Sequence, residues 1–215
     1  MVPEKRARAG DPFHINPLAP VAVPTDEIYE KYLQKAIREI NDLGDEIARA
    51  AGEGAVPVLG SGHPMADILL LKYGPQGSEL EEGVAFYGRA GQAVLRSLQR
   101  LRVDPMSVYG TNCLKFEGAK PDKRSREWLA RELHIVQPKL VVCMGDDALE
   151  FLNALAFPLS ERVEPKVGEL QRLTPTIEAL VVPDIDASLD EQPAKTAFWN
   201  AFKPVGAWWA ELPPY

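Results

Sequence analysis

The 215-residue chain has few cysteines, no long hydrophobic run and no excess of positive charge, and each shortage excludes a class of protein. Its two cysteines, Cys113 and Cys143, are too few for a disulfide framework, so we expect buried thiols in a cytoplasmic protein. The apolar runs, such as Ile68 to Leu71, are far too short to cross a bilayer. No apolar segment follows the basic residues at positions 5–8, so we expect neither a secretory signal nor membrane association.

The charge balance limits the partners. A net charge of −7 makes the chain as a whole a poor match for a polyanion, so any binding of DNA must use a local basic patch. No group of His, Cys and Asp residues has the spacing of metal ligands, so we expect no metal site. The length and the hydrophobic fraction of 46% suit one globular domain, which we expect to be a monomer.

The chain divides into an arm and a domain. Residues 1–25 contain five prolines and little periodicity, which indicates an extended arm before a domain of residues 26–215. A helix is expected from Thr25 to about Ala51. Short apolar runs then alternate with helical segments, which predicts an α/β fold with a parallel sheet covered on both faces. The expected strands are 67–71, 107–111, 139–144 and 179–183, and the expected helices are 90–102, 124–136, 146–155 and 193–211.

Ligands bind such sheets at the carboxyl ends of the strands, and the segments around those ends carry a resemblance. These segments are "VLGSGHPMADILLL" (58–71), "AFYGRAGQAVLRSL" (85–98), "VYGTNCLKF" (108–116) and "QPKLVVCMGDDAL" (137–149). Their order and spacing resemble the uracil-DNA glycosylase superfamily, and most closely its family 4, the iron–sulfur type. The resemblance implies a three-layer α/β/α sandwich with a central four-stranded parallel sheet. It also implies an enzyme that flips uracil out of DNA and hydrolyses its N-glycosidic bond.

The resemblance assigns roles to single residues. The family's stacking Phe falls on Phe86, and its base-reading Asn falls on Asn112. Family 4 has Gly-Glu-Ala-Pro-Gly where this chain has Lys72 to Gln76, so Tyr73 occupies the position of the acid, and Gly74 and Pro75 continue the pocket wall. A phenol with a pKa near ~10 is a poor base at neutral pH.

The third motif and the cluster also depart from the family. Where the family has His-Pro-Ser, this chain has Asp186-Ala187-Ser188, so Asp186 replaces the catalytic His. The four cluster thiolates would fall near Asp45, Ala48, Phe116 and Ser125, none of which is Cys. A four-iron cluster needs four ligands, so we expect no cofactor.

Each candidate also has a structural interpretation. Phe86 is otherwise a core aromatic, and Asn112 a turn or capping residue. Glu79 and its acidic neighbours form a solvated loop, unless Glu79 supplies the missing carboxylate. Asp186 starts a turn, unless it is itself the displaced catalytic acid. Arg89 lies at a helix start where a phosphate binds well, although a local salt bridge is the alternative.

A basic stretch offers the expected contact with DNA. Lys120, Lys123 and Arg124 lie within residues 115–126, and the alternative is a charged loop in solvent. With the acid and the His replaced, we expect a retained nucleobase pocket with weak or absent uracil excision. Two alternatives stay open: an active DNA glycosylase that uses Asp186 or Glu79, and a non-catalytic module that binds nucleic acid or a protein.

Overall fold

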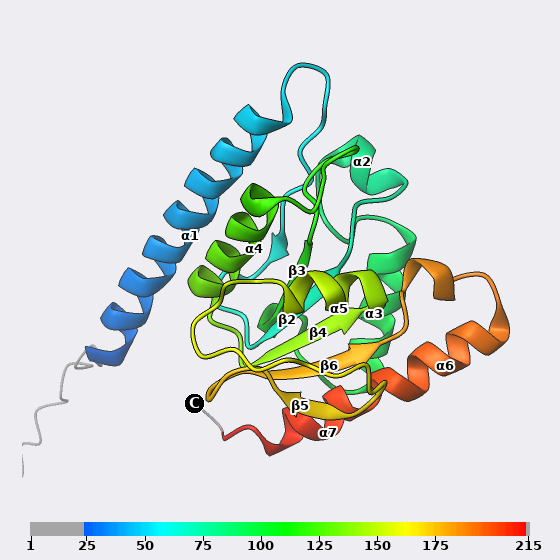
Figure 1. Cartoon of the computed structure of the whole chain (residues 1–215). Coiled ribbons are helices and arrows are strands. Elements are labelled where there is room, and N and C mark those ends of the chain that lie inside the picture. Colours follow the sequence, from blue (N-terminus) through cyan, green and yellow to red (C-terminus); the bar gives the residue numbers. More distant parts are fainter. Residues whose placement is uncertain (1–23, 214–215) are drawn as a thin grey trace, which may run out of the picture.

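The computed structural model describes residues 24–213, and the arm predicted for residues 1–25 lies outside this range except for its last two residues. Figure 1 shows a twisted sheet with helices on both faces. The strand order is β1-β3-β2-β4-β6-β5. The strands are β1 (Ser61–Gly62), β2 (Ile68–Lys72), β3 (Val108–Asn112), β4 (Leu140–Met144), β5 (Leu170–Arg172) and β6 (Glu178–Val182).

The sheet corrects the predicted strand number. The four expected strands, β3, β2, β4 and β6, run parallel at its centre, each within about one residue of its predicted position. The α/β class is therefore confirmed, but the sheet has six strands, because β1 and β5 pair antiparallel with its outer edges. These edge strands have only two and three residues, too few for a hydrophobic alternation to appear in the sequence.

Helices form a layer on each face of the sheet (Figure 1). On one face, α4 (Lys123–Val136) and α5 (Asp146–Asn153) cover the strands. On the other face lie α3 (Arg89–Arg100), α6 (Gln192–Phe202) and α7 (Pro204–Glu211). One helix was expected over 193–211, but Pro204 divides it, because proline has no N–H for the helix and its ring clashes with the preceding turn.

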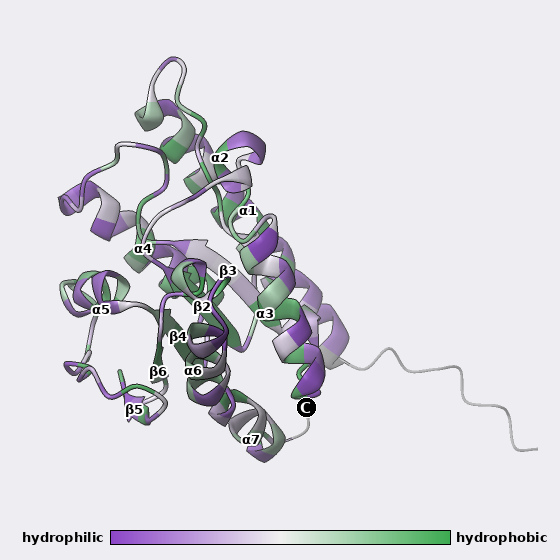
Figure 2. Cartoon of the chain, turned by 90° about the vertical axis from the view of Figure 1, so that its right-hand side faces the viewer, coloured by the Kyte–Doolittle hydropathy of each residue, from purple (hydrophilic) through white to green (hydrophobic). Residues whose placement is uncertain are grey.

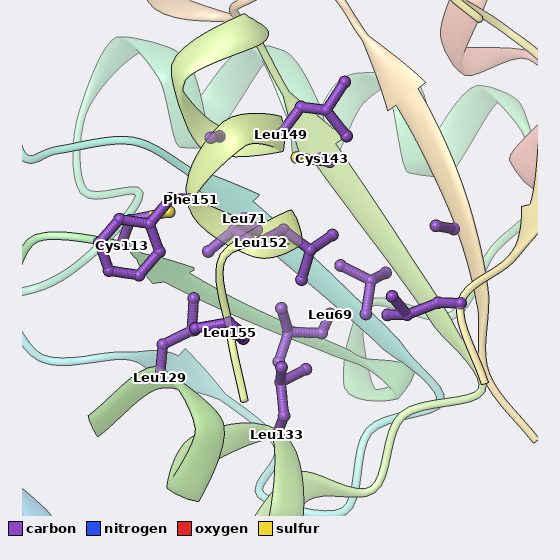
Figure 3. Close-up of a cluster of buried hydrophobic side chains, with 14 of the residues drawn as sticks. Leu69, Leu71, Cys113, Leu129, Leu133, Cys143, Leu149, Phe151, Leu152 and Leu155 are labelled. Atoms are coloured by element: carbon purple, nitrogen blue, oxygen red, sulfur yellow. The ribbon is translucent and has the colours of Figure 1, made fainter. Parts of the chain in front are cut away.

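The central strands are buried on both faces, which is why their sequences are mostly apolar. Figure 2 shows much of these strands in green, with β3 paler, while the outer helices carry purple residues. Leu69 and Leu71 of β2 point toward α4 and α5, where Figure 3 shows them among Leu133 and Leu152. Ile68 and the alternate residues of β2 point toward α3 and α6. Successive residues of a strand face opposite sides, so the two faces have separate hydrophobic cores.

The N-terminal helix, α1 (Pro24–Ala51), packs outside the α4 layer (Figure 1). Leu43 and Ile47 bury their side chains against Trp128 of α4, and Glu46 accepts a hydrogen bond from the Trp128 indole at 2.9 Å. None of the helices within residues 24–213 combines the length and the hydropathy that a membrane crossing requires.

Lys115 does not belong to the expected basic patch. Its side chain is fully buried, and its ammonium donates hydrogen bonds to Glu132 and Thr111. Tyr109 also donates to Glu132, at 3.0 Å. A buried charge requires a partner of opposite sign, and Glu132 is that partner. Lys115 is therefore part of the core between the sheet and α4, and the patch expected over residues 115–126 begins after it.

Two shorter helical segments complete the edge where the strands end. The five-residue helix α2 (Ser78–Glu82) follows β2, and a 3₁₀ turn, η2 (Asp186–Ser188), follows β6. A second 3₁₀ turn, η1 (Pro105–Ser107), precedes β3. Both α2 and η2 carry acidic residues to the same edge of the sheet.

Candidate nucleobase site

The candidate site lies where β2 and β3 end, on the face covered by α3 and α6. Lys72 and Asn112 are the last residues of these strands and are in register with each other. Residues in register on neighbouring strands point to the same side of the sheet. Lys72 is also in register with Met144, which packs in the α3 and α6 core, so this is the side that they share.

Lys72 is buried between two carboxylates that sequence analysis placed apart. Its ammonium lies 2.7 Å from Glu79 Oε2 and 2.5 Å from Asp186 Oδ2, and its side chain is 2% exposed. The two acids come from α2 and η2, so the lysine joins three segments of the chain. A buried ammonium without such partners would be strongly unfavourable. Lys72 therefore brings together both predicted catalytic acids.

Glu79 uses both of its carboxylate oxygens inside the protein. Oε2 accepts the backbone N–H of Gln76 at 2.9 Å in addition to the Lys72 ammonium, and Oε1 accepts the backbone N–H of Phe86. The predicted solvated acidic loop is a helix at this position, and Glu79 is its buried residue. Through these hydrogen bonds Glu79 holds the backbone of the segment from Gln76 to Phe86 in place.

Phe86 has a backbone conformation that is uncommon for a bulky residue. Its φ is +61°, in the left-handed region, so its neighbours must hold it there. Glu79 accepts its N–H, and Gly91 lets its carbonyl approach, since a Cβ at residue 91 would collide with that oxygen. A Cβ at Gly110 would lie 2.6 Å from Cδ2 of the Phe86 ring. Such a restrained residue points to a functional position.

Lys72 also contacts the Phe86 ring. Its Nζ lies 5.6 Å from the ring centroid, within the range of a cation–π interaction. The ring packs against the α3 and α6 core and is half-buried. The aromatic side chain expected to stack on a base is therefore in contact with an ammonium group.

Asn112 is fully buried, and its amide nitrogen and oxygen have no hydrogen-bond partner among the residues that the structure describes. Leaving such a group unpaired costs about 1–3 kcal/mol, so it needs an explanation. A side-chain amide offers one donor and one acceptor in one plane. Asn112 is therefore equipped to read a ligand edge that has one acceptor and one donor.

Asp186 lines a cavity of about 290 Å³ beside these residues. Its side chain is 16% exposed, and its contacts within the described chain involve Oδ2, which faces Lys72. Asp184 supports the turn by accepting the N–H of Asp186 at 2.8 Å, and burial raises the pKa of the Asp184 carboxyl. Neither Phe86 nor Asn112 lines this cavity; Lys72 connects its acidic wall with the Phe86 ring.

Tyr73 does not join the other candidates. Its ring packs edge-on against Phe151 of α5, with centroids 6.5 Å apart, on the opposite face from Phe86. Burial raises the pKa of its phenol, so Tyr73 stays protonated and is no base at neutral pH. Gly74 and Pro75 carry the chain from β2 toward α2, and the wall of the cavity begins after them, at Gln76.

The residues predicted to bind DNA lie in two places. Arg89 lines the cavity and forms an exposed ion pair with Asp190 at 2.5 Å, so its predicted local salt bridge is present. Lys120, Lys123 and Arg124 are exposed around the start of α4. Lys123 lies 3.5 Å from Glu127, so acids are interleaved with these cations.

The positions that the resemblance assigns to an iron–sulfur cluster hold no thiol. The Phe116 ring packs edge-on against Trp128 at 6.3 Å, and Ser125 Oγ donates to the Lys120 carbonyl at 2.7 Å. Both cysteines of the chain are buried elsewhere, and burial raises the pKa of the Cys143 thiol. Across residues 24–213, no three His, Cys, Asp or Glu side chains gather as metal ligands do. These residues do not fit the cluster.

Comparison with known proteins accords with this geometry. The family model of the uracil DNA glycosylase superfamily matches residues 59–203, which include every strand of the sheet and all of the site. The chain belongs to this superfamily. The match begins after α1, which packs on the outer side of α4.

The chain is also similar to three proteins named type-4 uracil-DNA glycosylase. That of Archaeoglobus fulgidus is 27% identical over 159 residues, which cover 69% of this chain and 80% of the relative. Those of Sulfurisphaera tokodaii and Pyrobaculum aerophilum are each 29% identical, over 108 and 126 residues. These two matches cover 46% and 55% of this chain, and 47% and 61% of the relatives.

Sequence reasoning gave no role to Lys72, although this lysine organises the site. The available signal was a charged residue at the end of an otherwise apolar strand, where a sequence alone does not tell burial from exposure. Two acids of opposite charge follow at positions 79 and 186, and only the fold brings them within ion-pair distance of the lysine.

We predict that Lys72→Met destabilises the protein by about 3–5 kcal/mol, because the buried Glu79 loses its counter-charge. Urea unfolding followed by circular dichroism measures the loss. The matched control is Lys72→Met/Glu79→Gln, in which the uncompensated charge is removed as well. The double variant should lose less than the sum of the two single losses; additivity within about 0.5 kcal/mol would show that the two groups are not coupled.

We predict that Asn112→Leu stabilises the protein by about 1–3 kcal/mol, because it removes a buried amide that has no partner. The same unfolding measurement tests this, with Asn153→Leu as the control. The Asn153 side chain donates to and accepts from the Val163 backbone, so its replacement should destabilise. Loss of stability in Asn112→Leu would assign Asn112 a structural hydrogen bond.

We predict that the purified protein is colourless and contains no stoichiometric iron, because the expected cluster positions hold no thiolate. Visible absorption spectroscopy and metal analysis after anaerobic purification measure both properties. About four irons per chain would contradict the assignment of the cluster positions.

Proposed function

We propose that this superfamily member binds a uracil-type base extruded from DNA and cleaves its N-glycosidic bond only weakly. The type-4 relatives are uracil-DNA glycosylases by name, and this relationship makes DNA the proposed partner. The observation that carries the proposal is the Lys72 ammonium, which engages both Glu79 and Asp186 and contacts the Phe86 ring.

Base recognition rests on Asn112 and Phe86. The N3–H and O4 edge of uracil offers one donor and one acceptor, which complement the unpartnered amide of Asn112. Phe86 supplies an aromatic ring on the same face of the sheet, and stacking on such a ring contributes about 1–3 kcal/mol per base. The Lys72 ammonium must yield part of its contact with the ring for a base to stack there.

Weak cleavage follows from the state of the acids. A general base must be free to hold or deprotonate water, and a carboxylate oxygen that already accepts hydrogen bonds inside the protein is less available for this role. Glu79 has both oxygens engaged, and Asp186 has Oδ2 engaged. Tyr73, at the position of the family's acid, faces α5 and remains a phenol.

A second candidate function is a slow glycosylase that uses Asp186. The observation in its favour is that, of the two acids that bind Lys72, Asp186 is the one that is partly exposed at the cavity, with side-chain contacts through Oδ2. In this case Asp186 orients the attacking water, and the nearby Lys72 ammonium stabilises the negative charge that develops on the departing base.

We predict that the wild type releases uracil from single- and double-stranded oligonucleotides at a rate about 10²–10⁴-fold below that of the Archaeoglobus fulgidus enzyme, the range of one general acid–base group. Single-turnover assays with strand cleavage at the abasic product measure the rate. Activity near that of the relative would contradict the main proposal. If Asp186→Asn abolishes the slow release that the wild type shows, the second candidate is correct; if the slow release is unchanged, Asp186 is not the acid.

Restoring the family's residues should raise the rate. Tyr73→Glu/Asp186→His recreates the first-motif acid and the third-motif His and keeps the Lys72–Glu79 ion pair, and its matched control carries Tyr73→Gln in place of Tyr73→Glu. We predict at least about a 10²-fold advantage of the Glu variant. Equal rates in the two folded variants would show that residue 73 does not face the base.

The affinity for DNA provides an independent test of the base site. The wild type should prefer a uracil-containing strand over the same strand with cytosine, whose edge presents donor and acceptor in the opposite order, and Asn112→Leu should lose this preference. Fluorescence anisotropy measures both affinities. A preference that survives in Asn112→Leu would remove Asn112 from the base site.

A further inference from the structure

A second cavity, of about 560 Å³, lies between α3 and α6 beside the candidate site. Arg89 and Leu189 line both cavities, so the groove continues directly from the cavity that holds Asp186. We call it the α3–α6 groove; Figure 1 shows both helices on one side of the sheet. Its volume is that of a small-molecule site, enough for a segment of a single strand but not for a duplex.

The α3–α6 groove is strongly basic although the protein is acidic. Its lining residues, all within the described part of the chain, include four cations and no acid. The cations are Arg89, Arg96, Arg100 and Lys195. Against a net charge of −7, this local excess marks the site where a polyanion is attracted.

Three of these cations keep their charge available. Arg96 donates to the Gln92 side chain at 3.3 Å, and Lys195 donates to the Asp190 carbonyl at 3.3 Å, both neutral acceptors. Arg100 stacks over the Trp199 ring at 4.3 Å, which orients its guanidinium without neutralising it. Arg89 pairs with Asp190, but both side chains are about 70% exposed, and such pairs exchange readily for a phosphate.

The spacing of the arginines suits a phosphate chain. Arg89, Arg96 and Arg100 lie seven and four residues apart, so they share one face of α3 and span about 16 Å at ~1.5 Å per residue. The phosphates of an extended single strand are farther apart than the rise of about 3.4 Å per residue in a duplex, so a few of them lie within this length. The lining of the groove also includes the apolar residues Ala93 and Phe198. Apolar side chains of this kind suit contact with bases and sugars.

We propose that the α3–α6 groove, which continues from the Asp186 cavity, binds single-stranded DNA on one side of the extruded nucleotide. A cationic rim over an apolar and aromatic floor is the usual arrangement for single-stranded nucleic acid. This inference rests on the proposed function, since it takes DNA as the partner. It replaces the stretch around Lys120, Lys123 and Arg124, where acids are interleaved, as the principal contact with the strand.

The test is the salt dependence of binding to a 5′-labelled single strand with one central uracil, measured by fluorescence anisotropy. Arg96→Gln/Arg100→Gln/Lys195→Gln removes three charges from the groove. The matched control, Lys120→Gln/Lys123→Gln/Arg124→Gln, removes three charges from the start of α4. We expect the groove variant to reduce the slope of log K against log salt by about 2, since each lost phosphate contact in a single strand contributes about 0.7. We expect the control to change the slope little.

Three results would overturn the inference: no binding of single strands by the wild type, an unchanged slope in the folded groove variant, or an equal change in the control. A slope change on duplex that equals the change on single strand would overturn the choice of a single strand. Arg96→Gln/Lys195→Gln, which keeps the Arg100–Trp199 contact, provides a second variant should the triple variant unfold.

The same assay separates this inference from the proposed function. A groove variant whose salt dependence is reduced, but which still prefers uracil over cytosine, supports both the groove and the proposed base site. If the wild type lacks this preference and the groove variant still shows a reduced salt dependence, the proposed base site is wrong and the groove is supported. Retained preference with an unchanged slope would remove the groove alone.

Discussion

The site depends on one buried ammonium. Lys72 ends the central strand β2 and binds Glu79 of α2 and Asp186 of η2, which lie 7 and 114 residues further along the chain. Glu79 in turn accepts the N–H of Phe86 and so holds the left-handed conformation of that residue. The aromatic ring, the two acids and the loop that connects them therefore share a single counter-charge, and none of them keeps its place independently of it.

In the proposed function, this arrangement separates recognition of a base from cleavage of its bond. Among the described residues the buried amide of Asn112 has no partner, and a ligand with a donor and an acceptor would recover the cost to stability. The carboxylates, by contrast, already have partners, so the charge that would activate water is compensated in the folded protein. The two positions where the resemblance places an acid and a histidine are held by a phenol that faces away and by an acid bound to an ammonium.

Much of the fold could be predicted from the sequence, because strands buried on both faces are mostly apolar, a pattern that is clear in β2, β4 and β6 and weaker in β3. The edge strands β1 and β5 were missed because they are too short for a periodic pattern. The acidic loop proved to contain α2, since five residues give little helical signal. Pro204 divided the last helix, although its effect on a helix interior is known in advance.

Candidate residues for the site could be named from the sequence, but how the fold arranges them could not be predicted. Asp186, Glu79, Phe86 and Asn112 were named as candidates, and the structure places all four on one face of the sheet. Lys115, expected in an exposed patch, is buried against Glu132, because a lysine gives no sign in the sequence of the partner that the fold will supply. The α3–α6 groove was missed for the same reason: Lys195 is far from the α3 arginines in the chain and joins them only in space.

The most direct test of the central interaction is nitrogen-15 NMR of the lysine ammonium groups. Buried, hydrogen-bonded ammonium protons exchange slowly with water, whereas exposed ones exchange too fast to be seen. Two fully buried lysines, Lys72 and Lys115, are found within residues 24–213, so two protected resonances are expected. Lys72→Met should remove one of them, and Asp186→Asn should shift that same resonance while leaving the other in place. A spectrum in which Lys72→Met removes no protected resonance would show that the Lys72 ammonium is not held between Glu79 and Asp186.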